Sequence, residues 1–171
     1  RDRRGADSDL YAARLLADGA PAPGWSANGS PLCTAPGDQA GVRLIRDGAG
    51  GLLAAWQDRR TGDWDVRAGR LSGTAGASPG WLANGVLVSG GAGDQTNPVL
   101  TGDGAGGGYF AWQDQRTGGS DIWAVRLDGN AAPPSGWTAG GTVLCGAPGE
   151  QGTPRIAAAA RALGNRLAAF A

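Results

Sequence analysis

The chain has 171 residues and no net formal charge, because its 15 basic residues, all of them arginine, balance 15 acidic residues. A neutral chain without a strong basic cluster has little attraction for nucleic acid or an anionic membrane surface, and no apolar run is long enough to span a membrane. The 33 glycines and 10 prolines, together with 41% hydrophobic residues, indicate many short strands joined by tight turns.

Four short strands separated by turn signals are predicted in each of three repeated units, and the chain begins on the third strand of a unit. In chain order these strands are 9–15, 29–33, 42–46, 52–57, 65–71, 85–89, 98–102, 108–113, 121–127, 141–145 and 154–158. Glycine-rich turns such as 47–51 supply the positive φ values that a tight hairpin needs. Residues 156–167 also allow a helix, so the last hairpin has two interpretations.

The units follow from a period of 56 residues in the sequence. Trp25, Trp81 and Trp137 are each 56 residues apart, and a Gly-Asp-Gln or Gly-Glu-Gln tripeptide recurs with the same step. The third copy departs from the pattern after Pro154, where alanines replace a glycine-rich turn. A period of this length predicts a repeat architecture, in which each unit buries its apolar faces against its neighbours.

The predicted fold is all-β and consists of β-propeller blades, that is, four-stranded antiparallel units in a circularly permuted order. The units comprise residues 42–97, residues 98–154, and residues 1–41 together with 155–171, within one domain. A β-solenoid and a set of separate β-modules are the alternatives. Since propellers have about four to eight blades, we expect other chains or further blades to complete the ring. Two copies would give six blades, and an open head-to-tail arrangement would give a filament.

The repeated motif carries a resemblance to a known family. The sequence Ala-Trp-Gln-Asp-x-Arg-Thr-Gly-x-x-Asp-Ile-Trp-Ala-x-Arg-Leu, followed by Gly-Trp and by Gly-Asp-Gln-x-x-Pro, resembles tandem propeller repeats of large secreted or surface proteins of bacteria. The resemblance covers the whole chain, and its motif is typical of an architecture rather than of an activity. It implies an extracellular or cell-surface location and a binding or structural role.

Aromatic side chains are the first candidates for binding a ligand. Three of them lie in glycine-rich loops, namely Trp25, Trp81 and Trp137. An exposed indole there would stack on a sugar ring, whereas the alternative is an anchor that packs the loop onto the sheet edge. Tyr11 and Trp123 occupy one equivalent position, where the middle unit has Arg67, and this variability is typical of a partly exposed site. Trp56 and Trp112 lie within strands and are predicted to be in the core.

Polar residues before the first strand of each unit are the second group of candidates. They are Asp38, Gln39, Asp94, Gln95, Glu150 and Gln151. These side chains would face a ligand at one end of a propeller or, in the alternative interpretation, fix the loop between units by hydrogen bonds. A calcium loop is a further hypothesis for Asp58 with Asp65 and for their equivalents, against an alternative in which the aspartates cap turn amides. No other cofactor is expected.

The two cysteines, Cys33 and Cys145, occupy equivalent positions two units apart. A disulfide requires Cα atoms within about 7 Å, so a bond within one chain is not expected. The sequence predicts two small, partly buried free thiols, with an interchain disulfide as the alternative.

The residue types argue against catalysis. The sequence has no histidine, no lysine and only one glutamate, so it offers no histidine-based triad, no Schiff-base lysine and no single asymmetric carboxylate pair. We therefore expect a non-enzymatic extracellular structural or assembly protein of bacteria that forms a homo-oligomer or polymer. The alternatives are a propeller that binds a glycan or cell-surface ligand, and a non-catalytic part of a larger secreted hydrolase. Neither nucleic acid binding nor membrane insertion is expected.

Overall fold

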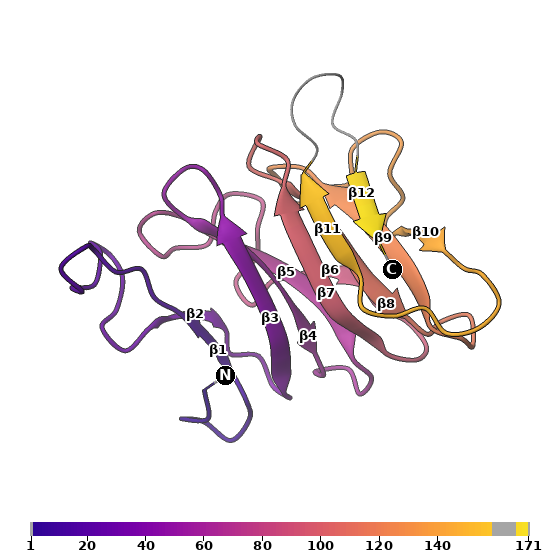
Figure 1. Ribbon diagram of the computed structural model, residues 1–171. Helices are drawn as coiled ribbons and strands as arrows, with labels where there is room; N and C mark the ends of the chain where they lie inside the picture. The colour runs from indigo at the N-terminus through magenta and orange to yellow at the C-terminus, as the bar shows by residue number, and fades with distance from the viewer. Residues whose placement is uncertain (1, 159–166, 171) are drawn as a thin grey trace.

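A computed structural model describes residues 2–158 and 167–170, and its strands form antiparallel sheets (Figure 1). The strands are β1 (Leu10–Ala12), β2 (Ser30–Cys33), β3 (Gln39–Arg46), β4 (Leu52–Asp58), β5 (Asp65–Leu71), β6 (Val86–Ser89), β7 (Gln95–Gly102), β8 (Gly108–Asp114), β9 (Asp121–Leu127), β10 (Thr142–Cys145), β11 (Arg155–Ala158) and β12 (Leu167–Phe170). Within the described residues there is no helix, and hence none that could cross a membrane. The predicted all-β class is confirmed.

Each sheet is built from strands that are consecutive in the chain. Strands β3–β6 form one four-stranded sheet and β7–β10 form a second, while β1–β2 and β11–β12 form two-stranded sheets. The four sheets follow one another from the N-terminal to the C-terminal side of the molecule (Figure 1). By their places in the repeat, β1 and β2 are the third and fourth strands of a unit, and β11 and β12 are the first and second.

The second and third strands of each complete sheet are buried on both faces because a sheet lies on either side of them. Strand β4 has the sequence Leu-Leu-Ala-Ala-Trp-Gln-Asp, and all of its residues except Gln57 are buried. Strand β8 shows the same pattern, with Gln113 as the exception. A short continuous apolar run of this kind is typical of a strand covered on both sides.

The first strand of each complete sheet begins earlier than predicted, because a bulge interrupts it without ending it. The ladder between β3 and β4 shifts between Ala40 and Arg43, and Gly41 takes a φ of +63° at this point. This left-handed conformation favours glycine, although the equivalent Asn97 and Thr153 also adopt it, with φ of +52° and +51°. The same shift in β7 includes Pro98, which has no N–H to donate to a ladder.

Two other predictions need correction. Strand β1 ends at Ala12 rather than at residue 15, because it pairs with β2 on one side only, whereas β5 pairs with a strand on each side. The alternative helix over 156–167 is wrong where the structure describes it, since β11 and β12 pair as an antiparallel hairpin. Residues 159–166 of that range lie outside the described residues.

The core lies between the sheets, in two clusters of buried apolar side chains. One cluster joins β1–β2 to the β3–β6 sheet and contains Trp56. The other joins the β3–β6 sheet to the β7–β10 sheet and contains Trp112. Both indoles are fully buried, which confirms their predicted place in the core.

Candidate functional site

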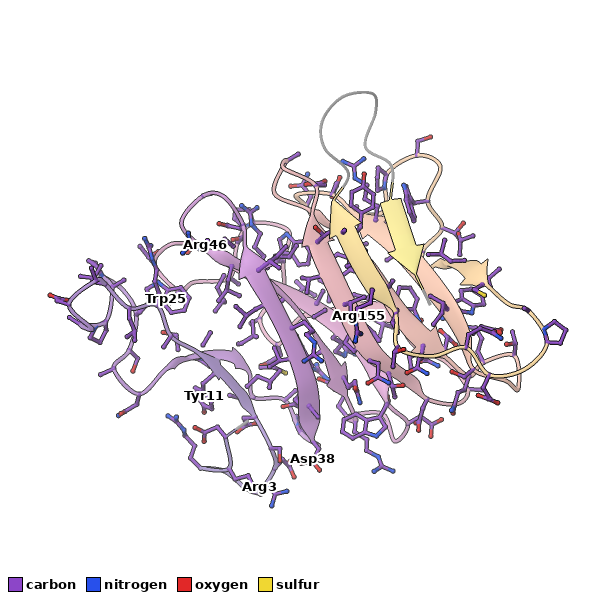
Figure 2. All side chains as sticks on the ribbon, in the orientation of Figure 1. Arg3, Tyr11, Trp25, Asp38, Arg46 and Arg155 are labelled. Atoms are coloured by element: carbon purple, nitrogen blue, oxygen red, sulfur yellow. The ribbon has the colours of Figure 1, made fainter. Side chains whose placement is uncertain are left out.

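The predicted polar residues lie where one sheet meets the next. In each case a carboxylate oxygen at the start of a sheet accepts a hydrogen bond from a backbone N–H of the preceding sheet or loop. The donor and acceptor residues are Ser8 and Asp38 (3.0 Å), Trp64 and Asp94 (3.0 Å), and Ser120 and Glu150 (3.1 Å). Asp38 directly precedes β3 and lies beside the loop that carries Arg3 (Figure 2). These residues therefore fix the connection between sheets, as the alternative interpretation predicted.

The neighbouring glutamines complete the same connection. The backbone N–H of each glutamine donates to the carbonyl oxygen of the residue whose N–H binds the carboxylate. These bonds are Gln39 to Ser8 (2.7 Å), Gln95 to Trp64 (2.6 Å) and Gln151 to Ser120 (2.6 Å). Their side-chain amides donate to carbonyl oxygens of their own loops, as when Gln39 Nε2 donates to Gly37 O at 2.7 Å. Gln39 and Gln95 are fully buried, so neither faces a ligand at the surface of the chain.

The loop tryptophans divide into two buried residues and one half-buried residue. Trp25 and Trp81 are 6% and 3% exposed. Their indole N–H groups donate to Gly73 O at 2.8 Å and Gly129 O at 3.0 Å, in the turn that follows the third strand of the next sheet. Trp25 and Trp81 therefore anchor loops to neighbouring sheets, and stacking on a sugar stays a prediction for Trp137.

Tyr11 and Trp123 are partly exposed, and each is covered by an arginine. The guanidinium of Arg4 lies 3.9 Å from the ring centre of Tyr11, and that of Arg116 lies 4.1 Å from the ring of Trp123. Cation–π contacts of this kind stabilise the pair by about 0.5–1 kcal/mol at exposed sites. Their ring faces are thus occupied by groups of the same chain.

A buried charged cluster lies between consecutive sheets, and we name each copy after its aspartate. The Asp58 cluster consists of Cys33, Trp56, Asp58, Arg60 and Arg67. The Asp114 cluster consists of Ser89, Trp112, Asp114, Arg116 and Trp123. In both, the aspartate accepts hydrogen bonds from an indole N–H and from an arginine, and a side chain of the preceding sheet lies against the pair.

The geometry of the Asp58 cluster explains why a charge is tolerated inside the core. Asp58 is fully buried, and its carboxylate accepts from Trp56 Nε1 at 3.1 Å and from Arg60 Nη2 at 2.6 Å. Burial alone would raise the pKa of Asp58, but the hydrogen bonds from Arg60 and Trp56 outweigh it and hold the pKa below its ordinary value. The pKa of Asp114 is lowered in the same way by Arg116 and Trp112.

The calcium hypothesis finds no support in these groups. Asp58, Asp114 and Asp2 each accept a backbone N–H two residues later in the chain, at 3.1, 3.0 and 2.9 Å, as turn-capping aspartates do. Among residues 2–158 and 167–170, no three histidine, cysteine or acidic side chains gather in a way that could hold a metal ion. Asp2, Asp58 and Asp114 therefore cap turns, as the alternative interpretation predicted, whereas Asp65 and Asp121 accept hydrogen bonds from threonine hydroxyls.

The cysteines are free thiols in different surroundings. Cys33 is buried in the Asp58 cluster, where its Sγ lies 3.2 Å from Arg60 Nη2, and Cys145 is half-buried at the end of β10. Burial raises the pKa of the Cys33 thiol, so the thiol stays protonated at neutral pH. The prediction of two free thiols is confirmed for the chain on its own.

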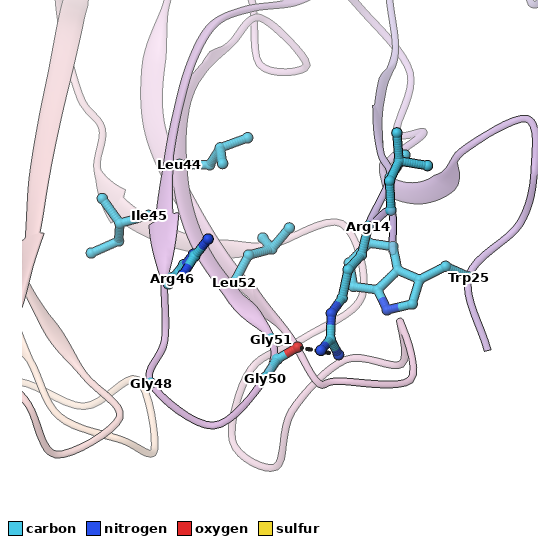
Figure 3. A pocket seen from close by; sticks show the side chains of 11 residues that line it. Arg14, Trp25, Leu44, Ile45, Arg46, Gly48, Gly50, Gly51 and Leu52 are labelled. Carbon is cyan, nitrogen blue, oxygen red and sulfur yellow. Dashed lines mark hydrogen bonds between the residues drawn. The ribbon is translucent and has the colours of Figure 1, made fainter. Parts of the chain in front are cut away.

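An open cleft of 560 Å³ lies between β1–β2 and the β3–β6 sheet. Figure 3 shows Arg14 and Trp25 on one side of it and Leu44, Ile45 and Arg46 on the other. Arg14 crosses the cleft to donate to Gly50 O at 2.9 Å. Apart from two arginines, the side chains that line the cleft are apolar. The cleft is therefore a space between neighbouring sheets, and its lining holds no acidic or nucleophilic side chain.

Comparisons with protein-family models, with curated proteins and with solved structures found no match.

Sequence reasoning missed the Asp–Arg clusters as units, although a signal for them was present. Asp-x-Arg recurs with the 56-residue step at Asp2, Asp58 and Asp114, and a cysteine or serine lies 25 residues before the second and third of these. Two residue types that recur in phase point to a contact between repeats. That the contact includes a buried tryptophan N–H required the structure.

Proposed function

We propose that this protein is a non-enzymatic structural or assembly protein whose sheets are blades of a β-propeller, and that it acts outside the bacterial cell. One observation carries the proposal, namely that the same backbone contact joins every described sheet to the next, with an indole hydrogen bond added at two of the three connections. The backbone bond to Gln39 is repeated at Gln95 and at Gln151, and the bond from Trp25 is repeated at Trp81. A module that adds units by one repeated contact is suited to building an extended or closed assembly.

The chemistry of the buried groups agrees with a structural role. Asp58 and Asp114 are the most deeply buried carboxylates of the described chain, and each is saturated by an arginine and an indole N–H. Groups held in this way stabilise a fold and are not free to transfer protons. The extracellular location rests on the resemblance of the repeat motif to tandem propeller repeats of secreted and surface proteins.

The experiment that tests this proposal is a measurement of size and shape. The purified chain is examined by light scattering over a wide range of concentration and by negative-stain electron microscopy. We expect association into closed rings or filaments larger than one chain. A compact monomer at every concentration would contradict the assembly function.

Glycan binding is the second candidate, and the partial exposure of Trp137 is the observation that favours it. A titration with a panel of sugars, followed by tryptophan fluorescence, tests this candidate directly. Binding that disappears in Trp137→Ala and persists in Trp25→Phe would support it, and unchanged fluorescence with every sugar would rule out stacking at this residue.

A further inference from the structure

The β10 edge of the β7–β10 sheet is uncovered, although the equivalent edge of the preceding sheets is buried. Leu144 in β10 is 46% exposed, whereas its equivalents Leu32 and Val88 are 5% and 3% exposed. The thiol of Cys145 is half-buried as well. The hairpin β11–β12 covers this sheet only in part, because β11 lies beside β7 and β8 while most of β10 stays exposed. We call Trp137, Leu144 and Cys145 the tail face.

The tail face also lacks the hydrogen bond that closes the other interfaces. The indole N–H groups of Trp25 and Trp81 donate to a turn of the following sheet, but that of Trp137 donates to no described residue. A β-carbon on the glycine before Trp25 or Trp81 would lie 2.9 or 2.7 Å from that turn, whereas the glycine before Trp137 has nothing within 4 Å. No residue of 2–158 or 167–170 therefore fills the space that a following turn would occupy.

The N-terminal hairpin is uncovered in a complementary way at Leu15, which borders the open cleft described above. Leu15 is 61% exposed, whereas its equivalents Leu71 and Leu127 are both 5% exposed and pack against the preceding sheet. Arg4 donates to Asp2 at 2.6 and 2.9 Å, as Arg60 does to Asp58, but no described thiol or hydroxyl of a preceding sheet contacts this pair. We call Asp2, Arg4, Tyr11, Ala13 and Leu15 the head face.

The strand edges of the two hairpins match in the same way. Among the described strands, β12 pairs only with β11, and β1 pairs only with β2. In the complete β3–β6 sheet the equivalent strands, β4 and β5, pair with each other over seven residues, from Leu52 opposite Leu71 to Asp58 opposite Asp65. The two hairpins lie at opposite ends of the described structure (Figure 1).

We propose that a second copy of this chain binds head to tail, with its head face on the tail face of the first copy and its β1 paired with β12. The inference rests on the assembly function proposed above and names the partner and the contact surface. By the spacing of the repeat, Leu15 of the second copy packs against Trp137 of the first copy. The carbonyl oxygen of Ala17 in the second copy then accepts a hydrogen bond from the indole N–H of that Trp137. Arg4 of the second copy then reaches Cys145, as Arg60 reaches Cys33.

The contact is heterologous, because two different surfaces meet. Each bound copy still presents one head face and one tail face, so the assembly either closes into a ring or grows as a filament. The joined hairpins form a four-stranded sheet with the strand order of the complete sheets, which also removes two exposed strand edges.

The first test places a charge on each face in turn. Leu15→Asp and Leu144→Asp are expected to raise the dissociation constant of self-association about a hundredfold or more, since both leucines become buried at the centre of the contact. Leu82→Asp is the matched control, because Leu82 is 67% exposed in a loop of a sheet that already has both neighbours. Thermal unfolding of each variant at low concentration checks the fold, which should be unchanged since both leucines are exposed in the single chain.

Mixing the two variants gives the decisive result. Leu15→Asp retains a working tail face and Leu144→Asp retains a working head face, so each variant alone should be monomeric while an equimolar mixture forms a one-to-one dimer. The dimer cannot grow, because both of its remaining faces carry the charge. Light scattering with a mass tag on one variant measures this stoichiometry.

The outcomes separate the two proposals. A wild-type chain that is monomeric at every concentration would overturn both the assembly function and the second copy as partner. If the wild type associates and Leu15→Asp and Leu144→Asp associate equally well, only the head-to-tail interface is overturned. Variants that are monomeric alone and also fail to pair when mixed would overturn the head-to-tail geometry, since a symmetric contact through one shared surface gives that result.

Discussion

The Asp58 and Asp114 clusters occupy equivalent places between consecutive sheets, yet they differ at two of five positions. Both have the tryptophan, the aspartate and the arginine that donates to it; the arginine Nε distances are 2.7 and 2.8 Å, and the indole distances are 3.1 and 2.7 Å. The Asp58 cluster has a thiol and a second arginine, Arg67, where the Asp114 cluster has a hydroxyl and Trp123. The shared residues are those that neutralise and hydrogen-bond the buried carboxylate, and the two that vary contact this core from outside.

The difference has an electrostatic consequence. Arg67 lies 3.9 Å from Asp58 through its Nε, which is buried and makes no hydrogen bond in the described chain. Burial lowers the pKa of Arg67, and the charge of Arg60 lowers it further. In the Asp114 cluster the Nε1 of Trp123 is likewise buried without a partner in the described chain, but its ring stacks on Arg116 and adds no charge, so the clusters differ in the like charge of Arg67. We therefore infer that the Asp58 cluster is the less favourable of the two.

Removal of the central carboxylate should have the largest effect. Asp58→Ala and Asp114→Ala each leave a half-buried arginine and a buried indole N–H without their acceptor, and each is expected to lower the free energy of unfolding by about 3 kcal/mol. The loss should be larger for Asp58→Ala, because two arginines then remain close together. Urea unfolding followed by tryptophan fluorescence measures both.

The exposed Asp63 supplies the control for these variants, and Asp63→Ala should change stability by less than about 0.5 kcal/mol. Equal losses at Asp58 and Asp114 would contradict the inference that Arg67 makes the first cluster less favourable.

Acidification should weaken both clusters, with a smaller effect than either alanine substitution. The folded-state pKa values of Asp58 and Asp114 lie below the ordinary 3.8, so both contribute stability that is present above that pH and is lost as the pH falls toward the folded-state values. The free energy of unfolding should therefore fall below a pH of about 4. In Asp58→Asn the fall should be shallower, because one of the two carboxylates no longer titrates, and a curve parallel to that of the wild type would argue against this assignment.

The sequence was sufficient for the repeat and for most of the strands because both depend on local chemistry. The Gly-rich turns and the apolar run of 52–57 placed β4 within one residue of its observed end, and β5 and β9 within the observed bounds. The sequence could not show that β3 begins at Gln39, because Gly41 and Val42 resemble the start of a strand. The strand extends back to Gln39 only because Gln39 pairs with Asp58, and Ala40 with Gln57, on the other side of the bulge. Nor could the sequence separate Trp137 from Trp25 and Trp81, since all three follow a glycine in similar loops and differ in whether a turn of the next sheet accepts the indole N–H.

A substitution that makes the first cluster resemble the second should increase stability. Arg67→Tyr removes a buried guanidinium with an unpaired Nε and places a ring beside Arg60, as Tyr11 lies beside Arg4 in the equivalent position. We expect a gain of about 1 kcal/mol, which combines the cation–π contact with the loss of a like-charge neighbour. The reverse change, Trp123→Arg, should lower stability by a similar amount, and a loss in both variants would mean that each residue is fitted to its own site.

The exchange of thiol and hydroxyl should have the smallest effect. Cys33 Sγ lies 3.7 Å from Asp58 Oδ2, and Ser89 Oγ lies 3.3 Å from Asp114 Oδ2, so the two groups serve as equivalent donors. We expect Cys33→Ser to change the free energy of unfolding by no more than about 0.5 kcal/mol, because the hydroxyl finds the same acceptor. Cys33→Val keeps the volume but cannot donate to Asp58 or accept from Arg60, so it should cost about 1 kcal/mol or more. If valine proves as stable as serine in urea unfolding, the position contributes packing alone, and the hydrogen bond between sheets rests on the arginine.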